Sequence, residues 1–179
     1  MKRYLITAPL CLFLSLPLLA DNLTHWQKRA EKGNINAQFN LGAMYDSGDG
    51  VSEDDAEAAN WYRKAADQGH VNAQFNLGVM YANGEGVAEN ATEAANWYRK
   101  AADQGDYRAQ YNLGVLYANG EGVPQSNSES YVWISIAVMS GHNNLVPKRD
   151  RAAEKLSKAD LDLAQQRAST LFEEIQQSE

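Results

Sequence analysis

Apolar and small residues recur along this 179-residue chain in two alternating helical patterns that are separated by glycine-containing turns. In the first pattern Ala37, Leu41 and Tyr45 lie four residues apart, which places them on one side of a helix. The second pattern begins at Asp54 and continues through several alanines to the next glycine. These alanines and Gly42 of the first pattern predict that the two helices approach closely. The chain is therefore predicted to be an all-α protein built from helix pairs.

The helix pair returns every 36 residues. Segment 37–69 matches segment 73–105 at 25 of 33 positions, and a third copy begins at residue 109 and then drifts. Copies in series must stack, because a single hairpin cannot bury both of its faces. We therefore expect an α-solenoid of three antiparallel helix-hairpin repeats, at residues 37–72, 73–108 and 109–144. The residues before them, 21–36, have the pattern of an N-terminal half-repeat helix.

A capping residue followed three positions later by glutamate opens the second helix of every repeat. The pairs are Asp54 with Glu57, Asn90 with Glu93, and Ser126 with Glu129. Such pairs are typical of a capping box, in which each side chain satisfies an orphan backbone amide. The glycines that follow the first helix are expected to end it in the left-handed conformation.

The repeated pattern resembles a known family. It reads A-x-x-x-L-G-x-x-Y-x-x-G-x-G-V and then A-x-x-W-x-x-x-A-A-x-x-G, which is similar to the Sel1-like repeat, a relative of the tetratricopeptide repeat. The resemblance covers 37–69 and 73–105 almost completely and 109–141 with departures. It implies a right-handed superhelix of antiparallel helix pairs that acts as a scaffold for protein–protein contacts. In bacteria, such proteins are often exported.

The second helix of the third repeat departs from the pattern because its polar face has become apolar. Arg99 and Lys100 of the second repeat correspond to Ser135 and Ile136 in the third. We expect the C-terminal segment, residues 145–179, to cover this surface with capping helices. Its apolar positions at helical spacing are Leu156, Leu161, Ala164, Ala168 and Leu171, and Ser157 is expected to cap the last helix. The alternative is an exposed apolar face used for dimerisation.

The first twenty residues have the layout of a secretory signal peptide. Lys2 and Arg3 precede an apolar run, which ends at the small residue Ala20. A membrane anchor is the less favoured interpretation, because the run is short and contains two prolines. Lipidation at Cys11 is also disfavoured, since Leu10 stands where a lipobox has a small residue. We therefore expect cleavage after Ala20 and a periplasmic or secreted bacterial protein without an integral membrane segment.

Composition narrows the possible functions. The chain carries 16 Lys and Arg against 23 Asp and Glu, a net charge of −7, which argues against nucleic-acid binding. Its single cysteine excludes an intramolecular disulfide framework and a thiolate-rich zinc site. Besides His25, the chain has His70 and His142 at the same position of two repeats, and these two are interpreted as polar loop residues too far apart to share a metal.

No catalytic set is apparent in the sequence. Some members of the Sel1-like family have been described as β-lactamases, but no serine here is followed three residues later by lysine, and no Gly-x-Ser-x-Gly elbow occurs. The acidic loop after Asp46 lacks the ligand pattern of an EF-hand. We therefore predict a non-enzymatic scaffold or adaptor with neither a metal nor a cofactor. The alternatives are a cell-envelope hydrolase acting on β-lactams or peptidoglycan, and a secreted factor that binds host proteins such as secretory immunoglobulin.

A candidate binding face lies opposite the buried stripe of each first helix. By resemblance to tetratricopeptide domains, this side lines a concave groove that would bind a protein or an extended peptide. An aromatic ladder flanked by amides supplies stacking area and hydrogen bonds. The candidate residues are Asn36, Phe39, Ser47, Asn72, Phe75, Asn83, Arg108, Tyr111 and Asn119. The other interpretation is that the three aromatic residues merely fill space between adjacent helices.

Overall fold

The computed structural model describes residues 16–177, with side chains from residue 23 onward. The predicted signal peptide, residues 1–20, lies mostly outside this range, and so does Cys11. Among the described residues, no helix combines the length and the apolar character that a membrane span requires.

The described residues form nine α-helices and one short 3-10 helix, and they contain no strand. The prediction of an all-α chain is thus confirmed. The elements in chain order are α1 Leu16–Glu31, α2 Ile35–Ser47, α3 Asp55–Asp67, α4 Val71–Asn83, α5 Ala91–Ala102, α6 Tyr107–Asn119, α7 Asn127–Met139, the 3-10 helix η1 Asn143–Leu145, α8 Val146–Ala153 and α9 Lys158–Gln177.

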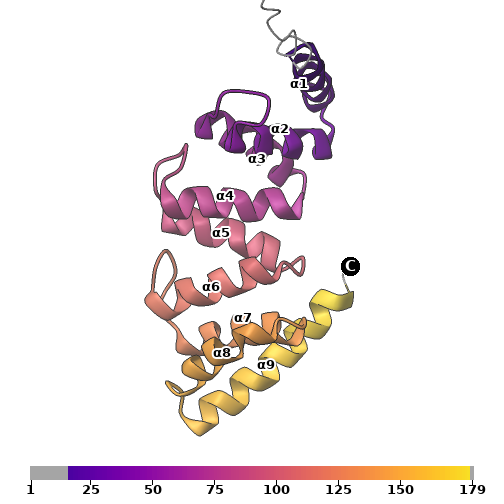
Figure 1. The fold of residues 1–179 in the computed structure, drawn as a ribbon. Coiled ribbons are helices and arrows are strands. Elements are labelled where there is room, and N and C mark those ends of the chain that lie inside the picture. The colour runs from indigo at the N-terminus through magenta and orange to yellow at the C-terminus, as the bar shows by residue number, and fades with distance from the viewer. Residues whose placement is uncertain (1–15, 178–179) are drawn as a thin grey trace, which may run out of the picture.

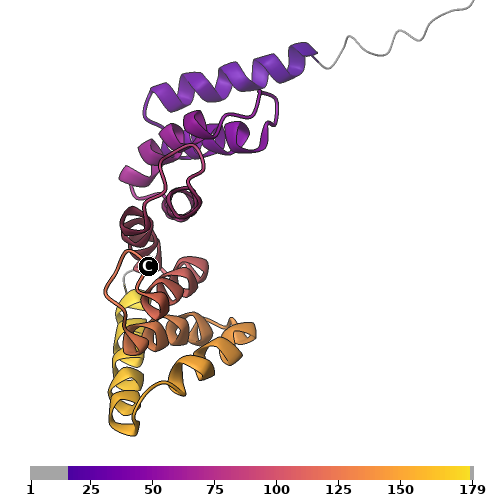
Figure 2. The ribbon, with the colours of Figure 1, turned by 90° about the vertical axis from the view of Figure 1, so that its left-hand side faces the viewer.

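The helices form an elongated stack in which chain order is also spatial order, from α1 at one end to α7, α8 and α9 at the other (Figure 1). Helices α2 and α3, α4 and α5, and α6 and α7 pack as hairpins, and the second helix of one hairpin contacts the first helix of the next. The stack is bowed rather than straight (Figure 2). The predicted solenoid is therefore confirmed, whereas its handedness stays a prediction.

Glycine permits the close contact within each hairpin. A Cβ atom on Gly42 would lie 2.6 Å from a ring carbon of Tyr62, and one on Gly78 would lie equally close to Tyr98. Both tyrosine rings are buried against these bare helix surfaces. The predicted close approach thus depends on a glycine–tyrosine contact in the first two hairpins, whereas in the third Gly114 faces Ile134.

The turn between the two helices of a hairpin also contacts the preceding repeat. Gly48 ends α2 in the left-handed conformation, as predicted, with φ of 68°. In the next turn, Gly86 has φ of 64°, and a Cβ there would clash with the backbone carbonyl group of Asp55. The turn of one repeat therefore rests on the start of the second helix of the repeat before it.

Only half of each predicted capping box is formed. The side chain of Asp54 accepts a hydrogen bond from the Glu57 amide, and Asn90 and Ser126 cap α5 and α7 in the same way. The backbone amide of Asp54, however, donates to the carbonyl oxygen of Tyr45 at 2.9 Å. The amides of the other two caps make the equivalent bond, so glutamate has no free donor to satisfy. The reciprocal half of the prediction is therefore wrong.

Buried glutamines join successive repeats. The Gln38 amide donates to the carbonyl oxygen of Ala30 at 3.1 Å, and its own oxygen accepts from Gln68 at 2.6 Å. The same arrangement recurs 36 residues later, where Gln74 of α4 donates to the carbonyl oxygen of Ala66 in α3 at 3.1 Å and accepts from Gln104 at 2.7 Å. The side-chain amides of Gln38 and Gln74 are thus satisfied at both their nitrogen and their oxygen.

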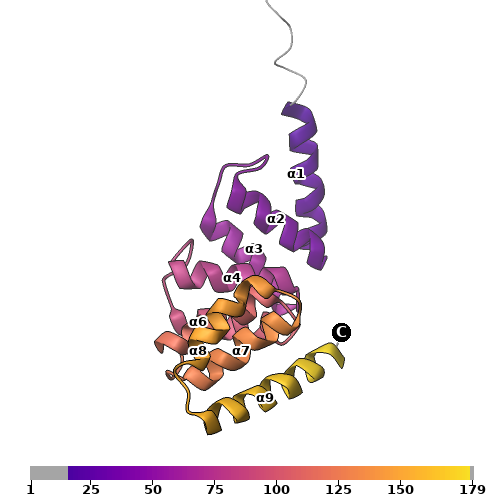
Figure 3. The ribbon, with the colours of Figure 1, turned by 60° about the horizontal axis from the view of Figure 1, so that its bottom comes forward.

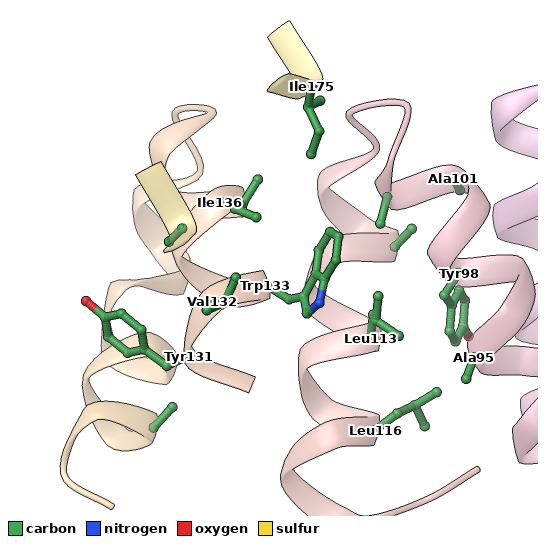
Figure 4. Packing of buried hydrophobic residues seen from close by; sticks show 14 of the residues in the cluster. Ala95, Tyr98, Ala101, Leu113, Leu116, Tyr131, Val132, Trp133, Ile136 and Ile175 are labelled. Atoms are coloured by element: carbon green, nitrogen blue, oxygen red, sulfur yellow. The ribbon is translucent and has the colours of Figure 1, made fainter. Parts of the chain in front are cut away.

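The C-terminal helices cover the apolar face of α7. Residues 130–137 of α7 are all buried, and both α8 and α9 pack against this helix (Figure 3). Trp133 reaches toward Leu113 of α6 and lies near Ile175 of α9 (Figure 4). Ala164 and Ala168 are buried in the same cluster, whereas Leu156, Leu161 and Leu171 are partly buried at its edge. The covered-face interpretation is therefore the one that the fold supports.

Candidate protein-binding face

The exposed side of α2, α4 and α6, here called the first-helix face, carries all nine predicted binding residues. They differ in exposure. Five are exposed polar side chains, namely Asn36, Ser47, Asn72, Asn83 and Asn119. Four are partly buried, namely Phe39, Phe75, Arg108 and Tyr111. The rows expected at 36-residue spacing are thus present on the surface, and their use in binding stays a prediction.

The binding-face aromatic residues of the first two repeats, Phe39 and Phe75, are partly covered by neighbouring aromatic rings. Phe39 stacks on His70 with ring centres 4.4 Å apart and planes 17° apart, and its ring centre lies 5.7 Å from that of Tyr62. The ring centre of Phe75 lies 5.9 Å from that of Tyr98. These rings are therefore neither free platforms nor fully enclosed, and they combine the packing role with a partly open edge.

His70 has a specific structural role that the loop interpretation missed. It is the N-cap of α4, and its Nδ1 accepts a hydrogen bond from the Ala73 amide at 3.2 Å. An accepting Nδ1 requires the unprotonated form at that nitrogen. Burial lowers the pKa of His70, which is the direction that this cap needs. Asn34 and Asp106 cap α2 and α6 at the equivalent positions.

Arg108 is engaged within the protein rather than free for a ligand. Its guanidinium carbon lies 4.2 Å from the centre of the Phe75 ring, and it donates to the Asn72 oxygen at 2.7 Å. It also forms an ion pair with Asp106. The hydrogen bond to Asp106 raises the pKa of Arg108. This residue therefore joins helices α4 and α6 on the first-helix face.

Polar groups that the sequence interpretation left out lie beside the aromatic residues. The Tyr62 hydroxyl donates to Asp46 at 3.1 Å and also interacts with Asn76 of the next repeat. Burial raises the pKa of Tyr62 well above its usual range, and Asp46 raises it further. Burial likewise raises the pKa of Tyr98 to about 12, and its side chain interacts with Asn112 of the next repeat. The signal was available, because asparagine recurs at the same place in every repeat.

The stack of Phe39 on His70 is not repeated at the other end of the first-helix face. The counterparts of these two residues, 72 positions later, are Tyr111 and His142. His142 stacks on Tyr107 instead, with ring centres 3.3 Å apart, and it makes no side-chain cap. The helix that His142 would cap also begins later, because η1 precedes the start of α8 at Val146. The junction after the third repeat therefore differs from the junction after the first.

Tyr111 instead lines a cavity of about 290 Å³ between α6, α7 and α8. Val115 and Ile134 contribute apolar walls, and the amides of two asparagines contribute polar groups. Three cationic side chains complete the lining, namely Lys148, Arg151 and Lys155. Sequence reasoning missed these cations, although Lys148 and Arg151 have the three-residue spacing of one helical side. Lys155 lies in the turn just after α8 ends at Ala153.

The other end of the first-helix face has a different character. A cavity of about 260 Å³ is lined there by Trp26 of α1, by Asn40, Met44 and Ser47 of α2, and by Asp49 of the following turn. Among the described side chains, no group of three or more His, Cys, Asp or Glu residues could hold a metal ion. The arrangement offers hydrogen bonds, apolar contacts and charge, which are the elements of a binding surface.

The chain is similar to Sel1 repeat proteins. The model of the Sel1 repeat family matches residues 35–70, 71–106 and 108–142. A Sel1 repeat protein from Oxalobacter formigenes is 34% identical, with a TM-score of 0.64, over 76% of this chain and 58% of that one. No curated protein matches the chain significantly.

Two further solved structures share the fold. The protein c5321, a protective antigen present in uropathogenic Escherichia coli strains, is 28% identical, with a TM-score of 0.66, over 87% of this chain and 41% of that one. The cysteine-rich protein B of Helicobacter pylori is 19% identical, with a TM-score of 0.58, over 75% of this chain and 97% of that one. The matched regions thus make up 58% and 41% of the first two proteins, and the third comparison supports the fold alone.

Proposed function

Because the chain belongs to the Sel1 repeat family, whose members are typically protein-interaction scaffolds, we propose that it is an exported, non-catalytic adaptor. It binds a protein partner along the first-helix face. The observation that carries this proposal is the row of exposed polar side chains at 36-residue spacing, with partly open aromatic edges between them. A surface that repeats in this way suits an extended segment, which presents similar groups at regular intervals.

A crosslinking experiment tests the binding face. A photoreactive amino acid is placed at Ser47 or Asn83 on the first helices, and in matched controls at Asn60 or Asn96, which are exposed on α3 and α5. We expect discrete crosslinked partners from the first two positions and none from the controls. Equal crosslinking from both pairs would contradict the proposal.

Export is a separate part of the proposal, and the basic start and apolar run of residues 1–20 support it. Fractionation of cells that express the full chain should recover it from the periplasm or the medium, shortened at its N-terminus after Ala20. Recovery of the uncleaved chain from the cytoplasm would contradict export.

A secreted factor that contacts host proteins is the second candidate. The similarity to c5321, described as a protective antigen, favours it. Fractionation also separates the two candidates, because this one requires the chain outside the cell, whereas an envelope adaptor stays in the periplasm.

A further inference from the structure

The cavity at the C-terminal end of the first-helix face concentrates positive charge in an acidic protein. Lys148, Arg151 and Lys155 all line it, although the chain as a whole has a net charge of −7. All three residues are exposed. A local field of one sign attracts ligands of the opposite sign.

These three cations have no carboxylate partner within ion-pair distance in the described part of the chain. Among the described cations, only Arg108, Arg149 and Arg167 form an ion pair. Like charges gathered at one cavity repel each other, so an anionic group placed among them would relieve that repulsion.

The cavity walls favour a polypeptide over a small inorganic anion. Tyr111, Val115 and Ile134 offer apolar contacts, and the amides of Asn119 and Asn127 offer hydrogen bonds. Tyr111 and Asn119, both in α6, also belong to the proposed binding residues of the first-helix face. An acidic side chain beside an apolar one would use both the charge and the walls.

We propose that this cavity binds an acidic segment of the partner protein, with an Asp or Glu carboxylate held by Lys148, Arg151 and Lys155. The inference rests on the proposed function and adds the chemistry of the partner. The opposite end of the first-helix face, at α2, carries Asp46 and Asp49. These carboxylates would repel an acidic segment, so the segment would be held at the α8 end.

Binding of defined peptides tests the inference. The probe is a fluorescein-labelled peptide of about ten residues made of glutamate, leucine, serine and glycine, and its control has glutamine for every glutamate. We expect the acidic peptide to bind the full chain more tightly and to weaken with added salt. The variant K148E/R151E/K155E should lose about tenfold or more in affinity.

Matched variants keep the result interpretable. K28E/K32E/K158E makes the same change in net charge at exposed lysines outside the cavity, and we expect it to bind like the wild type. K148Q/R151Q/K155Q removes the charge without reversing it and should also weaken binding. Circular dichroism checks that each variant is folded.

Several outcomes would overturn the inference. They are equal binding of the glutamine peptide, unchanged binding by K148E/R151E/K155E, equally tight binding of inorganic phosphate, and self-association of the chain through this cavity. If crosslinking at Asn83 succeeds while these tests fail, only the acidic-partner inference is lost. If crosslinking at Asn83 also fails, the proposed function is lost with it.

Discussion

The first two repeats are each followed by another copy of the hairpin, whereas the third is followed by non-repeat helices, and the second helices differ accordingly. In the first two, the exposed Lys64 and Lys100 lie over the rings of the buried Trp61 and Trp97, 3.6 and 3.7 Å from the ring centres. In the third, the residue at that position is Ile136, which is fully buried in the core that α9 shares, and the cation over the Trp133 ring is Arg99 of the preceding repeat. An interior repeat needs a surface on which the next copy can stack, whereas the last repeat needs one that other helices can close.

The largest expected effect comes from breaking this closure. In A168D, a carboxylate replaces a buried methyl group of α9 in the core shared with α7. We expect a loss of at least about 3 kcal/mol in the free energy of unfolding, measured by urea denaturation. S169D, at the neighbouring exposed position, is the control and should lose under about 1 kcal/mol. Similar losses in both would show that α9 does not close the third repeat.

A smaller loss is expected at a turn that all repeats share. In G86A the new Cβ would meet the Asp55 carbonyl oxygen, and the positive φ adds strain, so we expect a loss of about 2 to 3 kcal/mol by thermal or urea unfolding. G84A also has a positive φ but meets only ordinary contacts, and it should lose about 1 kcal/mol. Equal losses would mean that the contact between repeats adds nothing.

One substitution should make the third repeat more like the first two. Gln110 is fully buried and its oxygen has no hydrogen-bond partner among the described residues, because Ser140 stands where Gln68 and Gln104 stand in the earlier repeats. S140Q should supply the missing donor and stabilise the chain by about 1 kcal/mol in urea unfolding. Q104S removes the same donor from Gln74 and should cost a similar amount. A loss of stability in S140Q would contradict this explanation.

The smallest effect concerns pH at the junction of the first two repeats. The pKa of His70 is lower in the folded chain than the usual value of about 6.5, so the unfolded chain binds more protons in that range. The contribution of His70 is therefore complete above about pH 6.5 and is lost as the pH falls through the folded pKa.

Two variants test this assignment. H70N keeps a capping side chain, as Asn34 does in α2, and should flatten this part of the stability–pH curve measured by urea unfolding. H142N is the control, since His142 makes no cap hydrogen bond. An unchanged slope in H70N would contradict the role of His70.

Most of the architecture could be predicted because it depends on local pattern. Helical spacing, glycine turns and N-cap residues act within a few residues, and Asp54, Asn90 and Ser126 cap their helices as predicted. The glutamate half of the capping boxes failed because a carbonyl group from the preceding helix takes the donor instead. That contact depends on how two helices dock, which the local pattern does not encode.

By itself, the sequence determined the repeat, its period and the apolar surface that had to be covered, because periodicity and side-chain chemistry are properties of the chain. Only the tertiary structure decided that Phe39 stacks on His70. It also decided that Lys148, Arg151 and Lys155 line one cavity together with Tyr111. These contacts join residues that are distant in sequence and depend on how the helices pack, which no local pattern encodes.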